Sequence, residues 1–196
     1  MADKLKPCPM PDRYACIVVD PPWPMSKTGK RKSRPNQTTS IGYKTMTVEQ
    51  IAALPVKQLA QDDAAIFLWT THKFLAAGIF ILDKWGFRYQ RCLTWDKGNG
   101  MTLFGFHHRT EFCLFGYCGH LEPFQRKRAF PTVFGGKSMR HSAKPEEFFA
   151  LVEAYTSGPF LELFARNVRG GWHAWGNEVE CTLDEKAKKI LEATDD

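Results

Sequence analysis

The sequence lacks the features that mark several classes of protein. Its six cysteines include no Cys-x-x-Cys pair, and several lie within apolar runs. It has no signal-peptide pattern, and no apolar run approaches the roughly 20 residues that span a bilayer. No internal repeat is visible, and no linker separates two regions. These absences argue against a disulfide framework and a membrane partner, so we predict a cytoplasmic protein with reduced, buried thiols.

A metal site is the one alternative that the cysteines leave open. Cys113, Cys118 and His120 are close in sequence and carry side chains that bind zinc. However, they fall on a predicted strand and its exit, where two of them would serve as core residues. We therefore predict that the protein has no metal centre.

The composition is that of a globular protein with a moderate positive charge. The chain has 196 residues, of which 43% are hydrophobic, and its 27 basic and 21 acidic residues give a net charge of +6. This length suits one domain with a single core, which we assign to residues 1–196. The charge is compatible with a polyanionic partner.

Apolar runs with strand character alternate with helix-like segments along residues 14–178, which predicts an α/β fold. Thr47 and Gln50 form a capping box for a short helix that Pro55 interrupts. Pro145 is expected at the first position of a later helix, and Thr182 is expected to cap a peripheral C-terminal helix over 182–194. The predicted strands are 14–19, 64–70, 87–95, 110–117, 131–134, 160–164 and 172–175, and the other helices cover 72–85 and 145–155.

The first predicted strand ends in an unusual corner. The β-branched run Ile17-Val18-Val19 stops at Asp20, and Pro21, Pro22 and Trp23 follow. The two prolines end the strand and hold the next residues extended. Ligands of open α/β sheets bind at the carboxyl ends of strands, so we expect Asp20 to lie at a binding site.

This corner suits a planar group that carries an amine. Ionised Asp20 can only accept hydrogen bonds, and Pro21 offers only a carbonyl oxygen. Two neighbouring acceptors would polarise an exocyclic amine such as that of adenine or cytosine, and the aromatic ring would stack on the base. The alternative is a strand that simply ends in a turn, which would be the preferred interpretation of Asp-Pro alone. The whole tetrapeptide after an apolar strand is a much more specific signal.

Two clusters of basic residues are candidates for contacts with a nucleic-acid backbone. The first lies in residues 24–42, directly after the corner, and the second lies in residues 126–140. A solvated charged loop, or a chance match to a nuclear-localisation pattern, is the alternative for the first cluster. The candidates are Lys27, Lys30, Arg31, Lys32 and Arg34, then Lys97 at the end of the third long strand, then Arg126, Lys127 and Arg128.

A second group of polar residues lies near the C-terminus. Glu162 falls in a buried strand, where carboxylates are rare without a partner. Its strand is followed by basic, amide and acidic side chains that could bind hydroxyl and amino-acid groups. Glu162 could instead simply pair with Arg166, and Asn177 could merely cap a turn. The group consists of Lys144, Glu162, Arg166, Asn167, Asn177 and Glu178.

These motifs resemble a known family. Asp20-Pro21-Pro22-Trp23 resembles the catalytic motif of the MT-A70 family of S-adenosylmethionine-dependent adenine-N6 methyltransferases. The segment 141–146 is similar to the family's Ser-His-Lys-Pro segment, and 162–166 is similar to its Glu-Leu-Phe-Gly-Arg segment. The resemblance covers residues 14–178 and includes Gly42-Tyr43, Leu68-Trp69 and Trp172 followed by Gly176-Asn177.

The resemblance implies a Rossmann-like class I methyltransferase fold, with a mixed, mostly parallel sheet and the catalytic motif before the cofactor motif. It implies S-adenosylmethionine as the cofactor, and it places Tyr43 near the substrate or cofactor. Asp20 and the Pro21 carbonyl would polarise the amine, Pro22 would shape the corner and Trp23 would stack on the base. The implied cofactor-binding residues are Asp20, Lys144, Phe164, Arg166, Asn167, Asn177 and Glu178.

Three positions depart from the family's pattern. Ala165 replaces a glycine, which leaves the backbone there less free. No Pro-His pair stands between Arg166 and Asn167, which puts the alignment of Asn167 in doubt. Glu178 stands where better-known eukaryotic members have glutamine, which leaves its contact to the ribose uncertain.

The expected function is methylation of adenine N6 in DNA by a stand-alone bacterial or phage-like enzyme that acts as a monomer or homodimer. DNA is favoured over RNA because no zinc finger or other RNA-binding module is visible. An RNA adenine methyltransferase is one alternative. A catalytically inactive, nucleic-acid-binding subunit is another, although such a protein would be expected to lose Asp20. The expected location is the cytoplasm of a bacterium or phage-infected cell.

Overall fold

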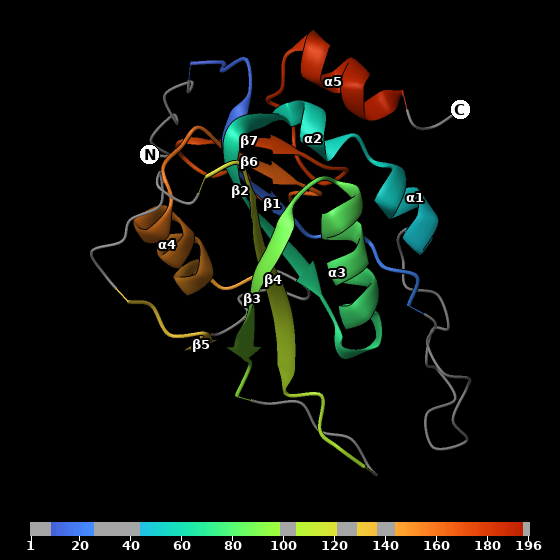
Figure 1. The fold of residues 1–196 in the computed structure, drawn as a ribbon, viewed down its shortest axis with the longest axis vertical. Helices are drawn as coiled ribbons and strands as arrows, with labels where there is room; N and C mark the ends of the chain where they lie inside the picture. The colour runs from blue at the N-terminus through green and yellow to red at the C-terminus, as the bar shows by residue number, and fades with distance from the viewer. Residues whose placement is uncertain (1–8, 26–43, 99–104, 121–128, 137–143, 194–196) are drawn as a thin grey trace.

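The computed structural model describes residues 9–25, 44–98, 105–120, 129–136 and 144–193. Within them, strands form one seven-stranded sheet in the order β5-β3-β4-β2-β1-β6-β7 (Figure 1). The strands are β1 (Tyr14–Val19), β2 (Ala60–Thr70), β3 (Arg88–Asp96), β4 (Thr110–Cys118), β5 (Val133–Gly135), β6 (Phe160–Leu163) and β7 (Trp172–Trp175).

Strand direction confirms the predicted mixed, mostly parallel sheet. β4 runs antiparallel to both of its neighbours, β2 and β3, whereas the other neighbouring strands are parallel. The carboxyl ends of six strands therefore meet at one edge of the sheet, together with the start of β4. This edge carries Asp20 after β1, Phe164 after β6 and Glu111 near the start of β4.

Helices cover both faces of this sheet. Among the described residues they are α1 (Val48–Ala53), α2 (Val56–Leu59), the 3₁₀ turn η1 (His72–Phe74), α3 (Leu75–Lys84), α4 (Glu146–Tyr155) and α5 (Glu185–Glu192). The predicted capping box is confirmed, because the backbone amide of Gln50 donates to Thr47 Oγ1 and the backbone amide of Thr47 donates to Gln50 Oε1. None of the described helices is long and apolar enough to cross a bilayer.

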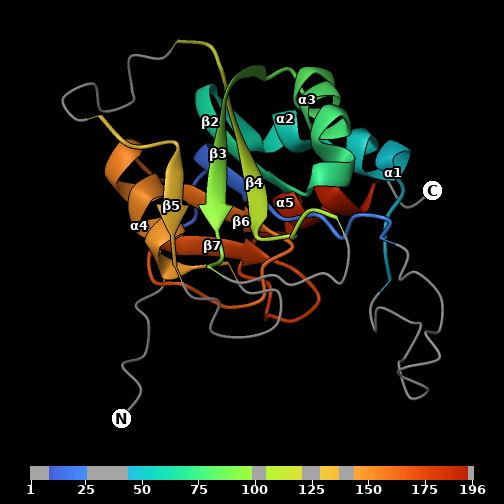
Figure 2. The same cartoon turned by 90° about the horizontal axis from the view of Figure 1, so that it is seen from below.

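Two core clusters occupy the two faces of the sheet, which gives an α/β/α arrangement (Figures 1 and 2). Alternate residues of β1 separate them, because Ile17 and Val19 belong to one cluster and Cys16 and Val18 to the other. The first cluster includes buried residues of α1, α2, α3 and α5. The second includes Phe148, Phe149 and Val152 of α4.

Two predicted helix starts are wrong. Pro145 has extended backbone angles and lies at the N-cap of α4, so the helix begins one residue later. The N-cap of α5 is Asp184, whose carboxylate accepts from the Ala187 amide at 2.7 Å. Thr182 does not cap this helix because its hydroxyl accepts from the Ala174 amide of β7 at 2.8 Å.

The predicted helix over 72–85 and the predicted start of β2 also differ from the structure. The first turn of the helix is the separate 3₁₀ turn η1, and Gly86 follows α3 with a φ of 76°, which suits glycine after a helix. β2 begins at Ala60 rather than Ala64, because Tyr14 of β1 pairs with Ala60 across a register shift.

α5 contributes its apolar side to the first core cluster. Leu183, Ala187 and Leu191 are 4%, 9% and 2% exposed, and they join residues of α1, α2 and the sheet. The charged residues of α5 are on its other side, where Lys188 pairs with Glu185. This burial indicates that α5 stabilises the sheet face behind the candidate site.

We expect the substitution Leu191→Ala to lower the free energy of unfolding by roughly 2–5 kcal/mol, because it leaves a cavity in the core. Chemical denaturation followed by circular dichroism measures this change. Glu192→Ala, at the exposed neighbouring position, serves as the control and should change the value by less than about 0.5 kcal/mol. Equal effects of the two substitutions would contradict the burial of α5.

Candidate active site

The corner after β1 has the rigid geometry that its prolines predict. β1 ends at Val19, and the Asp20 amide donates to the Leu163 carbonyl of β6 at 3.3 Å. The Trp23 amide donates to the Pro21 carbonyl at 2.8 Å, which closes a tight turn. A carbonyl oxygen has two lone pairs, so the Pro21 carbonyl keeps one acceptor site.

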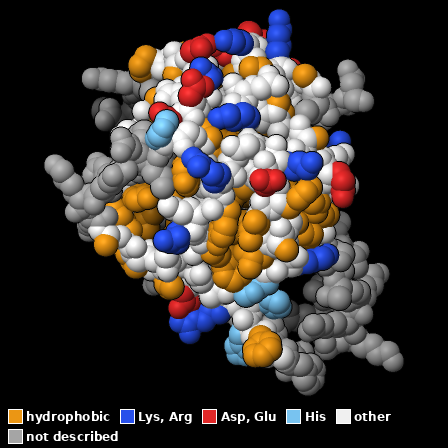
Figure 3. All heavy atoms as spheres, in the orientation of Figure 1, with side chains coloured by type: hydrophobic (Ala, Val, Ile, Leu, Met, Phe, Trp, Pro, Cys, Tyr) orange, Lys and Arg blue, Asp and Glu red, His pale blue; other side chains and the backbone are white. Residues whose placement is uncertain are grey.

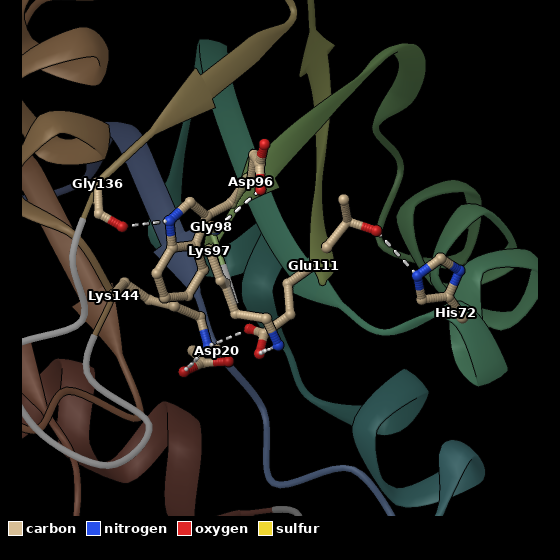
Figure 4. Close-up of polar contacts among 10 residues, drawn as sticks. Asp20, His72, Asp96, Lys97, Gly98, Glu111, Gly136 and Lys144 are labelled. Carbon is tan, nitrogen blue, oxygen red and sulfur yellow. Dashed lines mark hydrogen bonds and ion pairs between the residues drawn. The ribbon is translucent and has the colours of Figure 1, made fainter. Parts of the chain in front are cut away.

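Asp20 is part of a chain of alternating charges that comes from four elements (Figure 4). Lys144 Nζ lies 2.8 Å from Asp20 Oδ2 and 3.5 Å from Glu111 Oε2. Lys97 Nζ contacts the other oxygen of Glu111 at 3.2 Å. Lys144 precedes α4, Glu111 belongs to β4 and Lys97 follows β3. Segments that are far apart in sequence therefore meet at the carboxyl edge of the sheet.

Lys144 is held in its charged form by these two acids. Burial would lower the pKa of its ammonium group, but the charges and hydrogen bonds of Asp20 and Glu111 together raise that pKa above its usual value. The Lys144 side chain is only 11% exposed. Removal of either acid would leave a poorly compensated buried cation, which is costly.

Trp69 forms the wall beside this ion pair. Lys144 Nζ lies 4.8 Å from the centre of the Trp69 ring, within the range of a cation–π interaction. The Trp69 side chain is buried against Trp95, Phe134 and Phe148. Its backbone carbonyl also accepts from Trp23 Nε1 at 2.9 Å. Trp69 therefore connects the catalytic corner to the charged chain.

The packing of Trp23 in this structure does not suit the predicted stacking on a target base. Trp23 is 5% exposed, and its ring already stacks on Phe74 with centres 5.0 Å apart. With its indole nitrogen bound to Trp69, the ring belongs to the core rather than to an open binding surface. We therefore assign Trp23 to the support of the corner, not to contact with a base.

The predicted nucleic-acid contacts can be compared with the structure only at Lys97. Its side chain is 24% exposed and points to Glu111, so it belongs to the charged chain instead of a free surface (Figure 4). On the face in Figure 3, the described Lys and Arg side chains are interspersed with Asp and Glu. The other candidates lie outside the described residues: Lys27, Lys30, Arg31, Lys32, Arg34, Tyr43, Arg126, Lys127 and Arg128.

The predicted cofactor residues after β6 and β7 lie at the same edge of the sheet. Arg166 pairs with Glu178 at 3.1 Å, which joins the segments that follow the two strands. Asn167, Asn177 and Glu178 are exposed. Phe164 has a φ of 62°, the one positive value of a non-glycine residue in the described segments. A bulky residue in this region is strained, and such strain is concentrated at functional sites.

Gly176 allows these two segments to approach each other closely. The Ala165 amide donates to the Trp175 carbonyl at 2.9 Å, directly beside Gly176. A Cβ atom at position 176 would lie 2.3 Å from the Ala165 carbonyl oxygen. Among these described residues the positive φ of a non-glycine residue is at Phe164, not at Ala165, which replaces the family's glycine.

Glu162 is a partly buried carboxyl group in β6, one of the strands that end at this edge. Burial raises its pKa to about 7, and the charge of Arg169 is the largest influence in the opposite direction. Asp20 and Glu146 raise the pKa further, and Lys144 lowers it. The sequence left Arg166 open as a partner of Glu162, whereas in the structure Arg166 forms an ion pair with Glu178.

The residues at this edge fit a zwitterionic methyl donor such as S-adenosylmethionine. The neighbouring carboxylate of Asp20 and ammonium of Lys144 complement the two charged groups at the amino-acid end of such a molecule. Lys144 has three N–H donors, of which two face Asp20 and Glu111. The exposed amide and acid groups after β6 and β7 suit ribose hydroxyls. No cluster of three or more metal-binding side chains occurs among the described residues.

Glu111 is a residue of the site that the sequence motifs do not predict. Glu111 is the second residue of β4, and it belongs to none of the motifs that the sequence shows. An acid near the start of an apolar strand was the one available signal. Its place in the site follows from the antiparallel direction of β4, which brings the start of this strand to the edge where the other strands end.

The fold and the site together define a Rossmann-like α/β protein with a charged binding edge at the ends of its parallel strands. Comparison with known proteins narrows this class. The model of the MT-A70 family matches residues 14–178, and the chain belongs to this family of methyltransferases.

Curated relatives agree with this assignment. The type II methyltransferase M.MunI of Mycoplasma sp. is 29% identical over 198 residues, which cover 85% of this chain and 78% of the relative. The human N(6)-adenosine-methyltransferase catalytic subunit METTL3 is 27% identical over 180 residues, or 86% of this chain. A putative N(6)-adenosine-methyltransferase MT-A70-like protein of Medicago truncatula is 29% identical over 178 residues. The chain spans 28% and 26% of the length of these two eukaryotic relatives.

The raised pKa of Glu162 leads us to expect a free energy of unfolding that depends on pH. The pKa is about 7 in the folded state against a usual value of 4.5, so the folded state favours the protonated form. Stability from this group is therefore lost as pH rises from 4.5 to 7. We expect Glu162→Gln to raise the free energy of unfolding at pH 8 by roughly 3 kcal/mol, with no gain at pH 4.

Denaturant unfolding at several pH values measures this difference between wild type and variant. Glu192→Gln, which removes an exposed carboxylate, is the matched control and should show no such pH dependence. A Glu162→Gln gain that is constant from pH 4 to pH 8 would contradict the raised pKa.

Proposed function

We propose that this protein transfers a methyl group from S-adenosylmethionine to the N6 amine of adenine in DNA. The observation that carries the proposal is the placement of Asp20 at the carboxyl edge of the sheet, with one carboxylate oxygen 2.8 Å from Lys144. Family membership and relatives named as N(6)-adenosine-methyltransferases support the reaction and the target atom.

The acceptor groups of the corner would prepare the amine. The second oxygen of Asp20 and the free lone pair of the Pro21 carbonyl accept its two N–H groups, which turns its lone pair away from the base ring. Pro22 fixes the direction of the chain, and Trp23 supports the corner from the core side. When bound, S-adenosylmethionine supplies an electrophilic methyl group that the amine can take without a covalent enzyme intermediate.

Positioning and electrostatics supply most of the acceleration in such a mechanism. Lys144 would bind the carboxylate of the donor and would hold the Asp20 side chain beside the amine through its contact with Oδ2. Phe164, Arg166, Asn167, Asn177 and Glu178 would hold the ribose and the rest of the donor. In duplex DNA the adenine must leave the base stack, which costs a few kcal/mol.

DNA is proposed as the polymer because the type II methyltransferase M.MunI matches this chain over 78% of its own length. RNA is the alternative, because the N(6)-adenosine-methyltransferase relatives match with similar identity. An inactive, nucleic-acid-binding subunit is a third possibility, and the intact Asp20 argues against it.

We expect Asp20→Asn to reduce methyl transfer by about 100-fold or more, because it removes the anionic acceptor that orients the amine. Binding of S-adenosylmethionine should weaken by less than about tenfold, because Lys144 and the segments after β6 and β7 remain. Transfer of labelled methyl groups to duplex DNA, single-stranded DNA and RNA measures the rate, and calorimetry measures the binding.

Asp62→Asn is the matched control, because Asp62 pairs with Arg13 at the surface and its side chain is 88% exposed. This control should retain wild-type transfer. Equal transfer by wild type and Asp20→Asn would contradict the mechanism. Methyl transfer to RNA but not to DNA would identify RNA as the substrate in place of DNA. Tight nucleic-acid binding without any methyl transfer would favour the inactive subunit.

A further inference from the structure

Arg169, in the connection between β6 and β7, makes a close set of contacts with the start of α4. Its two terminal nitrogens donate to the two carboxylate oxygens of Glu146, one of them at 3.1 Å. Its guanidinium carbon lies 3.7 Å from the centre of the Phe149 ring. Its backbone carbonyl also accepts from the Trp172 amide at 3.2 Å. Arg169 is therefore held at its terminal nitrogens, at the flat face of its guanidinium group and at its backbone carbonyl.

This arrangement is more than a surface ion pair. The Arg169 side chain is 21% exposed, and a bidentate pair stacked on an aromatic ring is stronger and more directional than a flexible lysine contact. Arg169 Nε is buried and has no hydrogen-bond partner among the described residues. The other contacts must therefore offset the cost of this unsatisfied donor.

The contacts join the two halves of the candidate donor site. Glu146 is the first residue of α4 and comes two residues after Lys144, which contacts Asp20. Arg169 comes three residues after Arg166, in the segment that carries the proposed ribose contacts. No other ion pair recorded between described residues joins α4 to the segment after β6.

We propose that Arg169 is a positioning residue for the methyl donor: with Glu146 and Phe149 it clamps the start of α4 to the segment after β6, and so holds Lys144 and Arg166 at a fixed separation. This proposal rests on the proposed function, because it assigns the donor to this edge. It adds a residue from the segment after Arg166, where the chain lacks the family's Pro-His pair.

Glu162 provides a second observation at the same place. Arg169 is the cation that most strongly lowers the pKa of the Glu162 carboxyl, and Lys144 acts in the same direction. Asp20 and Glu146 act in the opposite direction. Arg169 therefore also offsets a partly buried acid that is influenced by Asp20 and Lys144, and its loss would raise the pKa of Glu162 further.

The experiment is a double-mutant cycle on the full chain, with S-adenosylmethionine as the probe in calorimetry. We expect Arg169→Ala and Glu146→Ala each to weaken its binding by about tenfold, because either change releases the clamp. The double variant should be no weaker than the more affected single variant. The variant with exchanged charges, Glu146→Arg with Arg169→Glu, should bind S-adenosylmethionine at least about threefold more tightly than either single alanine variant.

Steady-state kinetics separates positioning from a general loss of structure. KM for S-adenosylmethionine should rise with the loss of affinity, whereas KM for the nucleic acid should stay within about twofold of wild type. Arg13→Ala is the matched control, because Arg13 pairs with exposed Asp62 far from this segment in sequence, and it should leave donor binding unchanged. If Arg169→Ala does not fold, Glu146→Gln tests the same contact from the other side.

The outcomes separate this proposal from the proposed function. Wild-type affinity in Arg169→Ala, or additive losses in the double variant, would overturn the clamp while leaving the methyltransferase function in place. Equal rises in both KM values would show that Arg169 supports the fold rather than the donor site. Failure of the wild-type protein to bind S-adenosylmethionine would overturn the proposed donor, and the clamp with it.

Discussion

The ion pair between Asp20 and Lys144 is the interaction on which the rest of the site depends. A lysine ammonium that is 11% exposed needs anionic partners, and Asp20 and Glu111 supply them from β1 and β4. This requirement constrains three elements at once, because β1, β4 and the start of α4 must meet at one point. The sheet satisfies it through a single strand of opposite direction, β4, whose first residues lie where its neighbours end.

The apolar surroundings strengthen this interaction. Trp69 covers the ammonium group on one side, and Trp23 and Phe74 fill the space behind the corner. Because water is largely excluded, charges act on one another more strongly than at an exposed surface. The same edge carries the strained backbone of Phe164 and the tight approach at Gly176. Rigid packing, a fixed charge pair and local strain are thus combined at the edge where we propose that the donor and the base meet.

The sequence predicted the features that depend on local chemistry. A β-branched run that stops at Asp20 and two prolines predicted the end of β1, and Thr47 with Gln50 predicted the start of α1. Glu111 and Arg169 could not be found in this way, because their contacts come from strand register and from a helix more than 20 residues away. Trp23 was assigned to the base because its stacking partner, Phe74, lies about 50 residues further along the chain.

The atom that receives the methyl group decides whether the corner after β1 acts on an adenine amine. DNA of mixed sequence would be incubated with the protein and S-adenosylmethionine carrying a deuterated methyl group, then digested to nucleosides and analysed by mass spectrometry. We expect the label in N6-methyldeoxyadenosine, because the corner after β1 presents acceptors to an exocyclic amine and several relatives are named N(6)-adenosine-methyltransferases. Label in N4-methylcytosine, in a ring carbon, or in no nucleoside at all would contradict it.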